Sequence, residues 1–154
     1  MPEQDFTFLD PGELIDGDLQ LVLRQKLPAL PDKGFVPAYS FAMVLTGTAT
    51  TMGQISLRIG ETDHIVLYAG HIGYGVDEKY RGRRYAARAC RLILPLAARH
   101  GLKAVWITVN PDNAASRRTC EILGAQLVNT VDVPPETEMY ARGDRQKCRY
   151  RIDL

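Results

Sequence analysis

A helix framed by two strands is the feature of this sequence that most constrains its fold. Residues 83–100 repeat apolar side chains on one helical face, and Gly101 follows as a favoured C-terminal stop. The segment 64–76 before the helix and the near-continuous apolar segment 103–109 after it are both predicted to be strands. Strand, helix and strand within about 40 residues make a βαβ unit. Residues 70–76 and 103–109 should therefore run parallel, joined by a right-handed crossover.

The rest of the chain supplies further strands and one more helix. Strands are predicted at 19–25, 40–47, 51–60, 125–133 and 147–154, with 40–47 and 51–60 as an antiparallel pair. The second helix is predicted within 113–125, with Asp112 or Asn113 as its N-cap and Gly124 as its stop. With no repeat or linker, the chain is expected to form one domain, 1–154. The expected fold class is α/β (α+β type): a mixed, mostly antiparallel sheet with a parallel βαβ centre and helices packed on it.

Composition excludes several classes of protein. The sequence is 45% apolar and 24% charged, which is ordinary for a soluble globular domain. The longest apolar run, 92–98, is far too short to cross a bilayer, and residues 1–10 do not resemble a signal peptide. The three cysteines are odd in number and widely spaced, which favours reduced thiols, and with three histidines they show no metal-ligand spacing. We expect a cytoplasmic protein with no metal and no membrane partner.

Charge is distributed unevenly between the two halves of the chain. Residues 1–80 hold 5 basic and 11 acidic side chains (5 − 11 = −6), and residues 81–154 hold 14 and 7 (14 − 7 = +7). The asymmetry indicates either two kinds of partner, an anion on the C-terminal half and a cation on the N-terminal half, or a chance difference between solvated surfaces.

An arginine cluster at the start of the 83–100 helix predicts an anion site. A helix N-terminus presents backbone N–H groups that lack intrahelical acceptors, and arginines beside them complete a site for phosphate oxygens. Residues 81–85 are assigned to this site, and Arg88 and Arg91 to a solvated face. Glycines at 70, 73 and 75 in the preceding strand indicate that another group approaches its backbone closely. Aromatic residues are few near the cluster, so a nucleic-acid partner is not expected.

Two blocks of the sequence resemble the GNAT superfamily of acetyl-CoA-dependent N-acetyltransferases. "GYGVDEKYRGRRYAARAC" (73–90) is similar to the CoA-binding signature [RQ]-x-x-G-x-[GA] with its preceding strand. "VNPDNAASRRTCEILGA" (109–125) resembles the following strand end and helix, where an Asn, a small residue and a terminal Leu-Gly recur. The resemblance implies the GNAT fold, in which the strands at 70–76 and 103–109 splay apart and the pantetheine arm of CoA enters between them.

The resemblance also implies the residues that bind acetyl-CoA. Backbone N–H groups from Arg81 to Ala86 would hold the pyrophosphate, and Tyr74 to Val76 would line the pantetheine arm and polarise the thioester carbonyl. Asn113 and Ser116 match positions that face that arm. The expected cofactor-binding residues are Tyr74, Gly75, Val76, Arg81, Gly82, Arg83, Arg84, Tyr85, Ala86, Asn113 and Ser116.

The sequence departs from the family pattern at two positions. Arg84 replaces the middle glycine of the signature. Either the turn has ordinary helical dihedrals there and the side chain points to solvent, or the guanidinium reaches a CoA phosphate. Cys120 replaces a helix tyrosine that protonates the departing thiolate in many members. It is a candidate catalytic acid, and the alternative is a small apolar core residue.

The acceptor side is less defined by the sequence. His71 is a candidate general base because its pKa is near neutral, although a lone histidine is more often structural. Other candidates are Glu61, Asp63, His64, Glu78, Tyr140 and Tyr150. The proline-rich loop 26–40 leaves little room for substrate-side helices, which predicts an open acceptor groove.

The resemblance predicts acetyl transfer from acetyl-CoA to a primary amine by direct attack. The alternative is a CoA-binding regulatory module without turnover. The expected partners are acetyl-CoA, the co-substrate, and an amine-bearing small molecule or peptide, with a homodimer left open.

Overall fold

The computed structural model describes residues 6–154, which form two antiparallel sheets. The larger sheet has five strands in sequence order: β1 (Leu14–Asp16), β2 (Leu19–Leu27), β3 (Ala38–Leu45), β4 (Thr51–Arg58) and β5 (Ile72–Val76). The smaller sheet has the order β6 (Ala104–Val109), β8 (Gln146–Asp153), β7 (Gln126–Asp132). The helices are α1 (Tyr85–Arg99), α2 (Ala114–Ile122) and the single turn α3 (Glu138–Ala141). The fold class is thus confirmed as a mixed α/β arrangement with mostly antiparallel strands.

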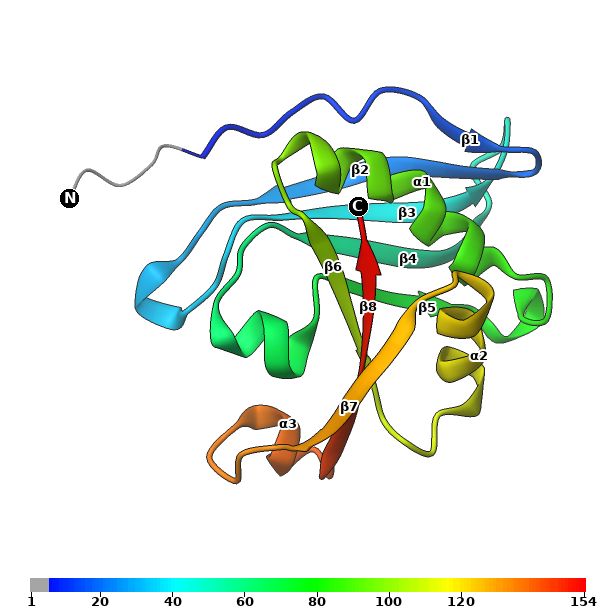
Figure 1. Ribbon diagram of the computed structural model, residues 1–154. Helices are drawn as coiled ribbons and strands as arrows, with labels where there is room; N and C mark the ends of the chain where they lie inside the picture. The colour runs from blue at the N-terminus through cyan, green and yellow to red at the C-terminus, as the bar shows by residue number, and fades with distance from the viewer. Residues whose placement is uncertain (1–5) are drawn as a thin grey trace.

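Helix α1 lies across one face of the larger sheet, and α2 lies beside the end of α1 where that helix begins (Figure 1). The apolar face that the sequence predicts on α1 is buried, with Ala89, Cys90, Ile93 and Ala97 fully inaccessible. These side chains meet the inward residues of the sheet in one core. The helix therefore has a fixed position over the sheet.

The two sheets separate where the βαβ unit was predicted to be continuous. Strands β5 and β6 flank α1 in the chain, but no ladder joins them in the described part of the chain. The segment just before β5 contacts β6 instead, where the His71 N–H donates to the Trp106 carbonyl over 2.7 Å. The predicted parallel centre is thus a pair of diverging strands, as the resemblance implied (Figure 1).

The strand predicted at 64–76 is wrong in its first half. Residues Ile65–Ala69 form a π-helix that ends at Gly70, whose φ is 75°. A Cβ on Gly70 would lie 3.0 Å from the Trp106 carbonyl oxygen, so the group that approaches this glycine is the neighbouring strand itself. The run of apolar residues at 65–69 fits a buried helix or a strand equally well, so periodicity alone could not decide between them.

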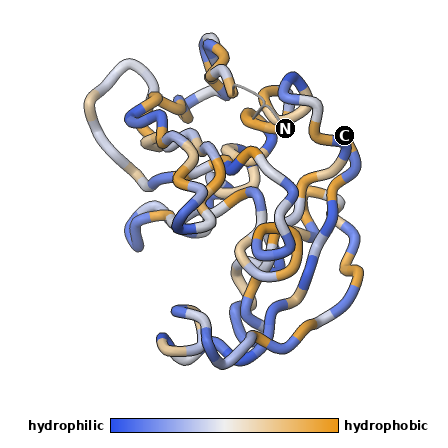
Figure 2. The backbone as a smooth tube through the Cα atoms, turned by 90° about the vertical axis from the view of Figure 1, so that its left-hand side faces the viewer, coloured by the Kyte–Doolittle hydropathy of each residue, from blue (hydrophilic) through white to orange (hydrophobic). Residues whose placement is uncertain are grey.

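Hydrophobic and hydrophilic residues are interleaved along the chain (Figure 2). Within residues 6–154, no helix combines the length and the apolar character needed to span a membrane.

Candidate active site

The turn into α1 has the geometry of an anion site. Gly82 and Arg84 both have left-handed backbones, with φ of 82° and 62°, and Arg84 is the one non-glycine residue with positive φ among those described. Arg84 precedes α1 as its N-cap, and no side chain caps the helix. Of the two alternatives for Arg84, the one that gives it ordinary helical dihedrals is therefore wrong. The backbone at Arg84 is left-handed, which favours glycine and costs roughly 1–2 kcal/mol for a residue with a Cβ.

A cavity of about 540 Å³ opens at this turn, between β5, the start of α1 and one side of α2. Every residue predicted to bind the cofactor lines it, with the exception of Arg83. Arg81 is fixed there because its Nε donates to the Val76 carbonyl over 2.9 Å. Asn113 caps α2 by accepting from the Ser116 N–H over 3.1 Å. Residues from three separate segments thus meet around one cavity, as the two sequence blocks predicted.

Two of the basic and aromatic residues near this turn have structural contacts. Tyr85 is only 2% exposed, and its hydroxyl donates to Asp18 over 2.6 Å, which raises the pKa of the phenol. Arg88 donates to the carboxylates of Asp16 and Asp18, each over 2.8 Å. The assignment of Arg88 to a solvated face is therefore wrong: it ties α1 to the β1–β2 turn. In the folded protein, the position of Arg88 on α1 brings its side chain to these two carboxylates. The spacing of residues in the sequence does not reveal this pairing.

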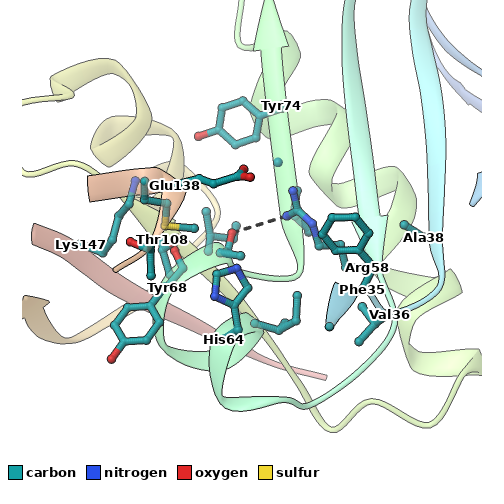
Figure 3. Close-up of a pocket in the computed structure, with 18 of the residues that line it drawn as sticks. Phe35, Val36, Ala38, Arg58, His64, Tyr68, Tyr74, Thr108, Glu138 and Lys147 are labelled. Atoms are coloured by element: carbon teal, nitrogen blue, oxygen red, sulfur yellow. Dashed lines mark hydrogen bonds between the residues drawn. The ribbon is translucent and has the colours of Figure 1, made fainter. Parts of the chain in front are cut away.

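A second cavity, of about 1130 Å³, opens beside β5 (Figure 3). Its walls come from the proline-rich loop, β4, the π-helix, β6 and α3. Tyr74, Asn113 and Ser116 line both cavities, so the two spaces meet at the gap between β5 and β6. The proline-rich loop, which was predicted to leave an acceptor groove open, forms part of the wall of this cavity.

The side chain of Tyr74 occupies the junction of the two cavities. Its hydroxyl is buried and has no hydrogen-bond partner among the described residues. Burial raises the pKa of Tyr74 to about 12. The hydroxyls of Ser116 and Thr119 on α2 lie near the phenol and act to lower this pKa, although neither meets the geometry of a hydrogen bond. The nearby Cys120 thiol adds to the increase. The phenol therefore stays protonated at neutral pH and can serve as a hydrogen-bond donor beside α2. The family resemblance predicts that the backbone of Tyr74 lines the pantetheine arm, but it predicts no role for the Tyr74 hydroxyl.

The two catalytic candidates from the sequence lie in the core. Cys120 is fully buried, and burial raises the pKa of its thiol to about 12. His71 is 1% exposed; its Nδ1 accepts from the Trp106 N–H over 3.0 Å, so its Nε2 carries the proton and donates to the Gly60 carbonyl over 2.7 Å. Burial lowers the pKa of His71. Both ring nitrogens are occupied, so the geometry gives His71 a structural contact between β5 and β6 and no free nitrogen for a substrate.

The remaining acceptor-side candidates divide by position. His64 lines the larger cavity, whereas Glu61, Asp63 and Glu78 are exposed and line neither cavity. Tyr150 is buried and accepts from Arg117 Nε over 3.2 Å. Tyr140, which also lines neither cavity, lies under the Arg145 guanidinium at 3.6 Å from the ring centroid.

Charged residues that the sequence analysis did not single out line the larger cavity. Arg58 from β4 and Glu138 from α3 both extend into it (Figure 3). Lys147 from β8 lies at its far wall and donates to Asn110 Oδ1 over 2.7 Å and to Asp144 over 3.3 Å. A lone arginine near the end of a strand carries no motif, so the sequence offered no signal for this group. In the described part of the chain, no three His, Cys, Asp or Glu side chains gather into a metal site.

Comparison with known families agrees with this geometry. Residues 11–126 match the family model described as an acetyltransferase (GNAT) domain. The chain belongs to the GNAT acetyltransferases. A search of curated proteins finds no match to the sequence.

Solved structures of this family share the fold. Ribosomal-protein-S5-alanine acetyltransferase from Vibrio fischeri superposes with a TM-score of 0.60 at 19% identity, covering 75% of this chain and 61% of that one. RimL, a ribosomal L7/L12 alpha-N-protein acetyltransferase, gives 0.59 at 19% identity, covering 80% and 72%. The microcin C7 self-immunity acetyltransferase MccE, in complex with acetyl-CoA and AMP, gives 0.57 at 18% identity, covering 76% and 61%. This chain thus spans only about three fifths of the length of the S5-alanine enzyme. At these identities the likeness shows the fold alone.

Proposed function

We propose that this protein transfers an acetyl group from acetyl-CoA to a primary amine by direct attack in a ternary complex. The observation that carries the proposal is the meeting of two cavities at Tyr74, Asn113 and Ser116. One cavity is lined by the residues that match the CoA-binding signature of the family, and the other is lined by β4, the π-helix, β6 and α3. A thioester at the junction would be reachable by an amine from the larger cavity. The neighbours RimL and MccE, which carry CoA and acetyl-CoA in their structures, support the cofactor assignment.

The smaller cavity would hold acetyl-CoA through backbone groups. The N–H groups at the start of α1 have no intrahelical acceptor and would bind the pyrophosphate, with the helix dipole favouring its charge. Residues 74–76 would line the pantetheine arm, and a backbone N–H there would polarise the thioester carbonyl. Arg84 is exposed at the rim of this cavity, within the first turn.

Tyr74 would assist the departure of the thiolate. When the neutral amine nitrogen attacks the thioester carbon, the C–S bond breaks, negative charge develops on the CoA sulfur, and the nitrogen releases one proton to solvent as the amide forms. The Tyr74 hydroxyl is an unpartnered donor near Cys120, the position of the tyrosine that the helix lacks. The phenol thus reaches the same region from the facing strand. With a pKa of about 12 it would act as a hydrogen-bond donor to the sulfur rather than lose its proton fully. Cys120 is left with a packing role.

The acceptor amine must be neutral before it attacks. Glu138 is the carboxylate that lines the larger cavity among the residues described, and in Figure 3 it points into the space between Tyr74 and Arg58. We assign to Glu138 the binding of the ammonium form and the uptake of its proton. His71 cannot take this role with both nitrogens engaged.

The chain is proposed to act as one domain, 1–154, because β8 pairs with both β6 and β7 and closes the second sheet beyond the region matched to the family model. We place it in the cytoplasm because its three cysteines are free and buried.

Thiol release from acetyl-CoA in the presence of amines, peptides and amino acids tests the function. An amine-dependent release with a product 42 Da heavier than the acceptor, about the mass of an added acetyl group, would support transfer. Saturable binding of acetyl-CoA with no release by any acceptor would favour the alternative of a CoA-binding module without turnover.

A further inference from the structure

The larger cavity contains a cation that the protein does not neutralise. Arg58 leaves the end of β4 and its Nη1 donates to the carbonyls of Gly70, over 3.1 Å, and Ala69, over 3.5 Å. Carbonyl groups orient a guanidinium without cancelling its charge. No carboxylate lies within ion-pair distance of Arg58 in the described chain, and burial lowers the pKa of its side chain. A half-buried arginine with no counter-ion is unfavourable unless a ligand supplies one.

The other basic residues in the described walls of this cavity provide a contrast. Lys147 and Arg142 both pair with Asp144, at 3.3 and 3.5 Å. Lys33 lies exposed on the proline-rich loop, where water screens its charge. Arg58 alone is held inside the cavity by carbonyls, with Nε and Nη2 making no hydrogen bond to residues 6–154. Those donors are not buried against protein and therefore face the cavity space.

The guanidinium of Arg58 lies next to β5, which determines where an anion bound to it would sit. A Cβ placed on Gly73 would lie 3.7 Å from both Nη1 and Nη2, so the guanidinium rests directly on the strand at Gly73. Gly73 adjoins Tyr74, where the proposed function places the thioester. An anion bound by Arg58 would thus sit beside the reacting centre. Glu138, of opposite charge, faces the same space (Figure 3).

We propose that the acceptor is a small amino-acid-type molecule, with a carboxylate on Arg58 close to the amine that is acetylated. The proposal rests on the proposed function and names its substrate class. A planar guanidinium matches a carboxylate in a two-point contact, and Glu138 complements the ammonium at the other end of the molecule. A peptide N-terminus offers a neutral carbonyl at the place where this acceptor has its carboxylate.

Paired acceptors test the proposal with the full-length protein. Acetyl transfer is measured for a panel of free amino acids, for their C-terminal amides and for the matching amines without the carboxyl group. For the best acid, kcat/KM should exceed that of its amide by roughly tenfold to a hundredfold, which is the range for a lost hydrogen bond to a charged group. In Arg58→Gln this ratio should fall to within about threefold of one, and Arg58→Lys should restore part of it. Because the ratio compares two acceptors on the same variant, a partly folded preparation does not change it.

Lys33→Gln is the matched control, since it removes one positive charge from the rim of the same cavity. The ratio should stay within about twofold of the parent, because an exposed charge contributes little. Equal use of acids and amides by the parent, or an unchanged ratio in Arg58→Gln, would overturn the proposal while leaving acetyl transfer intact. A preference for aminoalkyl phosphates or for peptides over free amino acids would also overturn it. Absence of transfer to every acceptor, with acetyl-CoA still bound, would instead remove the proposed function.

Discussion

The two cavities that meet at Tyr74 are built in different ways. The smaller one is made mostly of consecutive residues, from the end of β5 through the turn into α1, with one side of α2 opposite. The larger one is assembled from side chains of the proline-rich loop, β4, the π-helix, β6, α3 and β8. The first depends on backbone conformation and the second on side chains brought together by the fold. The proposed cofactor site is therefore encoded locally, whereas the proposed acceptor site depends on tertiary contacts.

The largest effect is expected from removing the phosphates that the local site would bind. Acetyl-pantetheine lacks the pyrophosphate, so its kcat/KM should be lower than that of acetyl-CoA by about a hundredfold or more, because several charge-assisted contacts are lost together. Thermal stabilisation by the two ligands should differ in the same sense. The matched control is acetyl-dephospho-CoA, which keeps the pyrophosphate and should lose much less. Equal kinetics for acetyl-pantetheine and acetyl-CoA would remove the phosphate site from the turn into α1.

Tyr74→Phe tests the junction of the cavities. Loss of the hydroxyl should lower kcat by about ten- to a hundredfold, in the range seen when one preorganised donor or acid is lost, with little change in KM for acetyl-CoA. Stability should hold or rise slightly, because a buried hydroxyl without a partner is removed. Rate measurements from pH 6 to 10 serve as a second readout.

The sign of the pH effect follows from the raised pKa of the phenol. A group with a pKa of about 12 remains protonated across that range, so the parent should show no alkaline loss of kcat from this residue. Tyr74→Phe should lower the whole profile without moving its limbs. A variant with unchanged kcat would assign Tyr74 a packing role only.

The same contrast explains what the sequence could and could not predict. The position of the turn into α1, the caps of α2 and the apolar face of α1 were predictable because neighbouring residues determine them, whereas the left-handed backbone of Arg84 was not. The prediction of a strand at 65–69, where the structure has a π-helix, is wrong because the hydrophobic period of a short apolar run does not distinguish a strand from a helix. Arg88 and Arg58 were missed because their partners, Asp16 in β1 and the Gly70 carbonyl, are identified only by the fold. Side-chain sites of this kind need the tertiary structure.

Cys120→Ala should affect stability more than catalysis. The thiol is fully buried, and its removal leaves a small cavity that costs about 1 kcal/mol or somewhat more. Turnover should stay within about threefold, because the pKa of the thiol is raised to about 12 and the proposed donor is Tyr74. Denaturant titration and steady-state kinetics on one preparation separate the two effects. A loss of turnover of a hundredfold or more in folded protein would return the acid role to Cys120.

The smallest effect is expected at Arg84. This residue contributes both through its backbone, which shapes the turn into α1, and through the charge of its side chain. Its backbone is left-handed, with φ of 62°, and its side chain is exposed at the rim of the smaller cavity. Replacing it with glycine relieves about 1–2 kcal/mol of backbone strain. Glycine also adds freedom to the unfolded chain, which opposes the gain by about 0.4–1 kcal/mol. The free energy of unfolding of Arg84→Gly should therefore rise by less than about 1.5 kcal/mol, a shift in Tm of a few degrees at most.

The affinity of Arg84→Gly for acetyl-CoA should fall, whereas its stability should rise. An exposed guanidinium near a phosphate contributes about 1 kcal/mol or less, so Arg84→Gly should weaken acetyl-CoA binding by about fivefold or less. Higher salt should narrow the difference in affinity between the variant and the parent, since the lost contact is electrostatic.

Arg84→Ala separates the effect of the backbone from that of the charge, because it loses the same contact and keeps the strain. Titration calorimetry and thermal melts should thus show both variants with equally reduced affinity and only the glycine variant with raised stability. If both variants bind as tightly as the parent at low salt, the backbone alone makes the site. An alanine variant as stable as the glycine variant would show that the left-handed turn carries no strain. The two measurements together divide the contribution of Arg84 between the conformation of the turn and the charge at its rim.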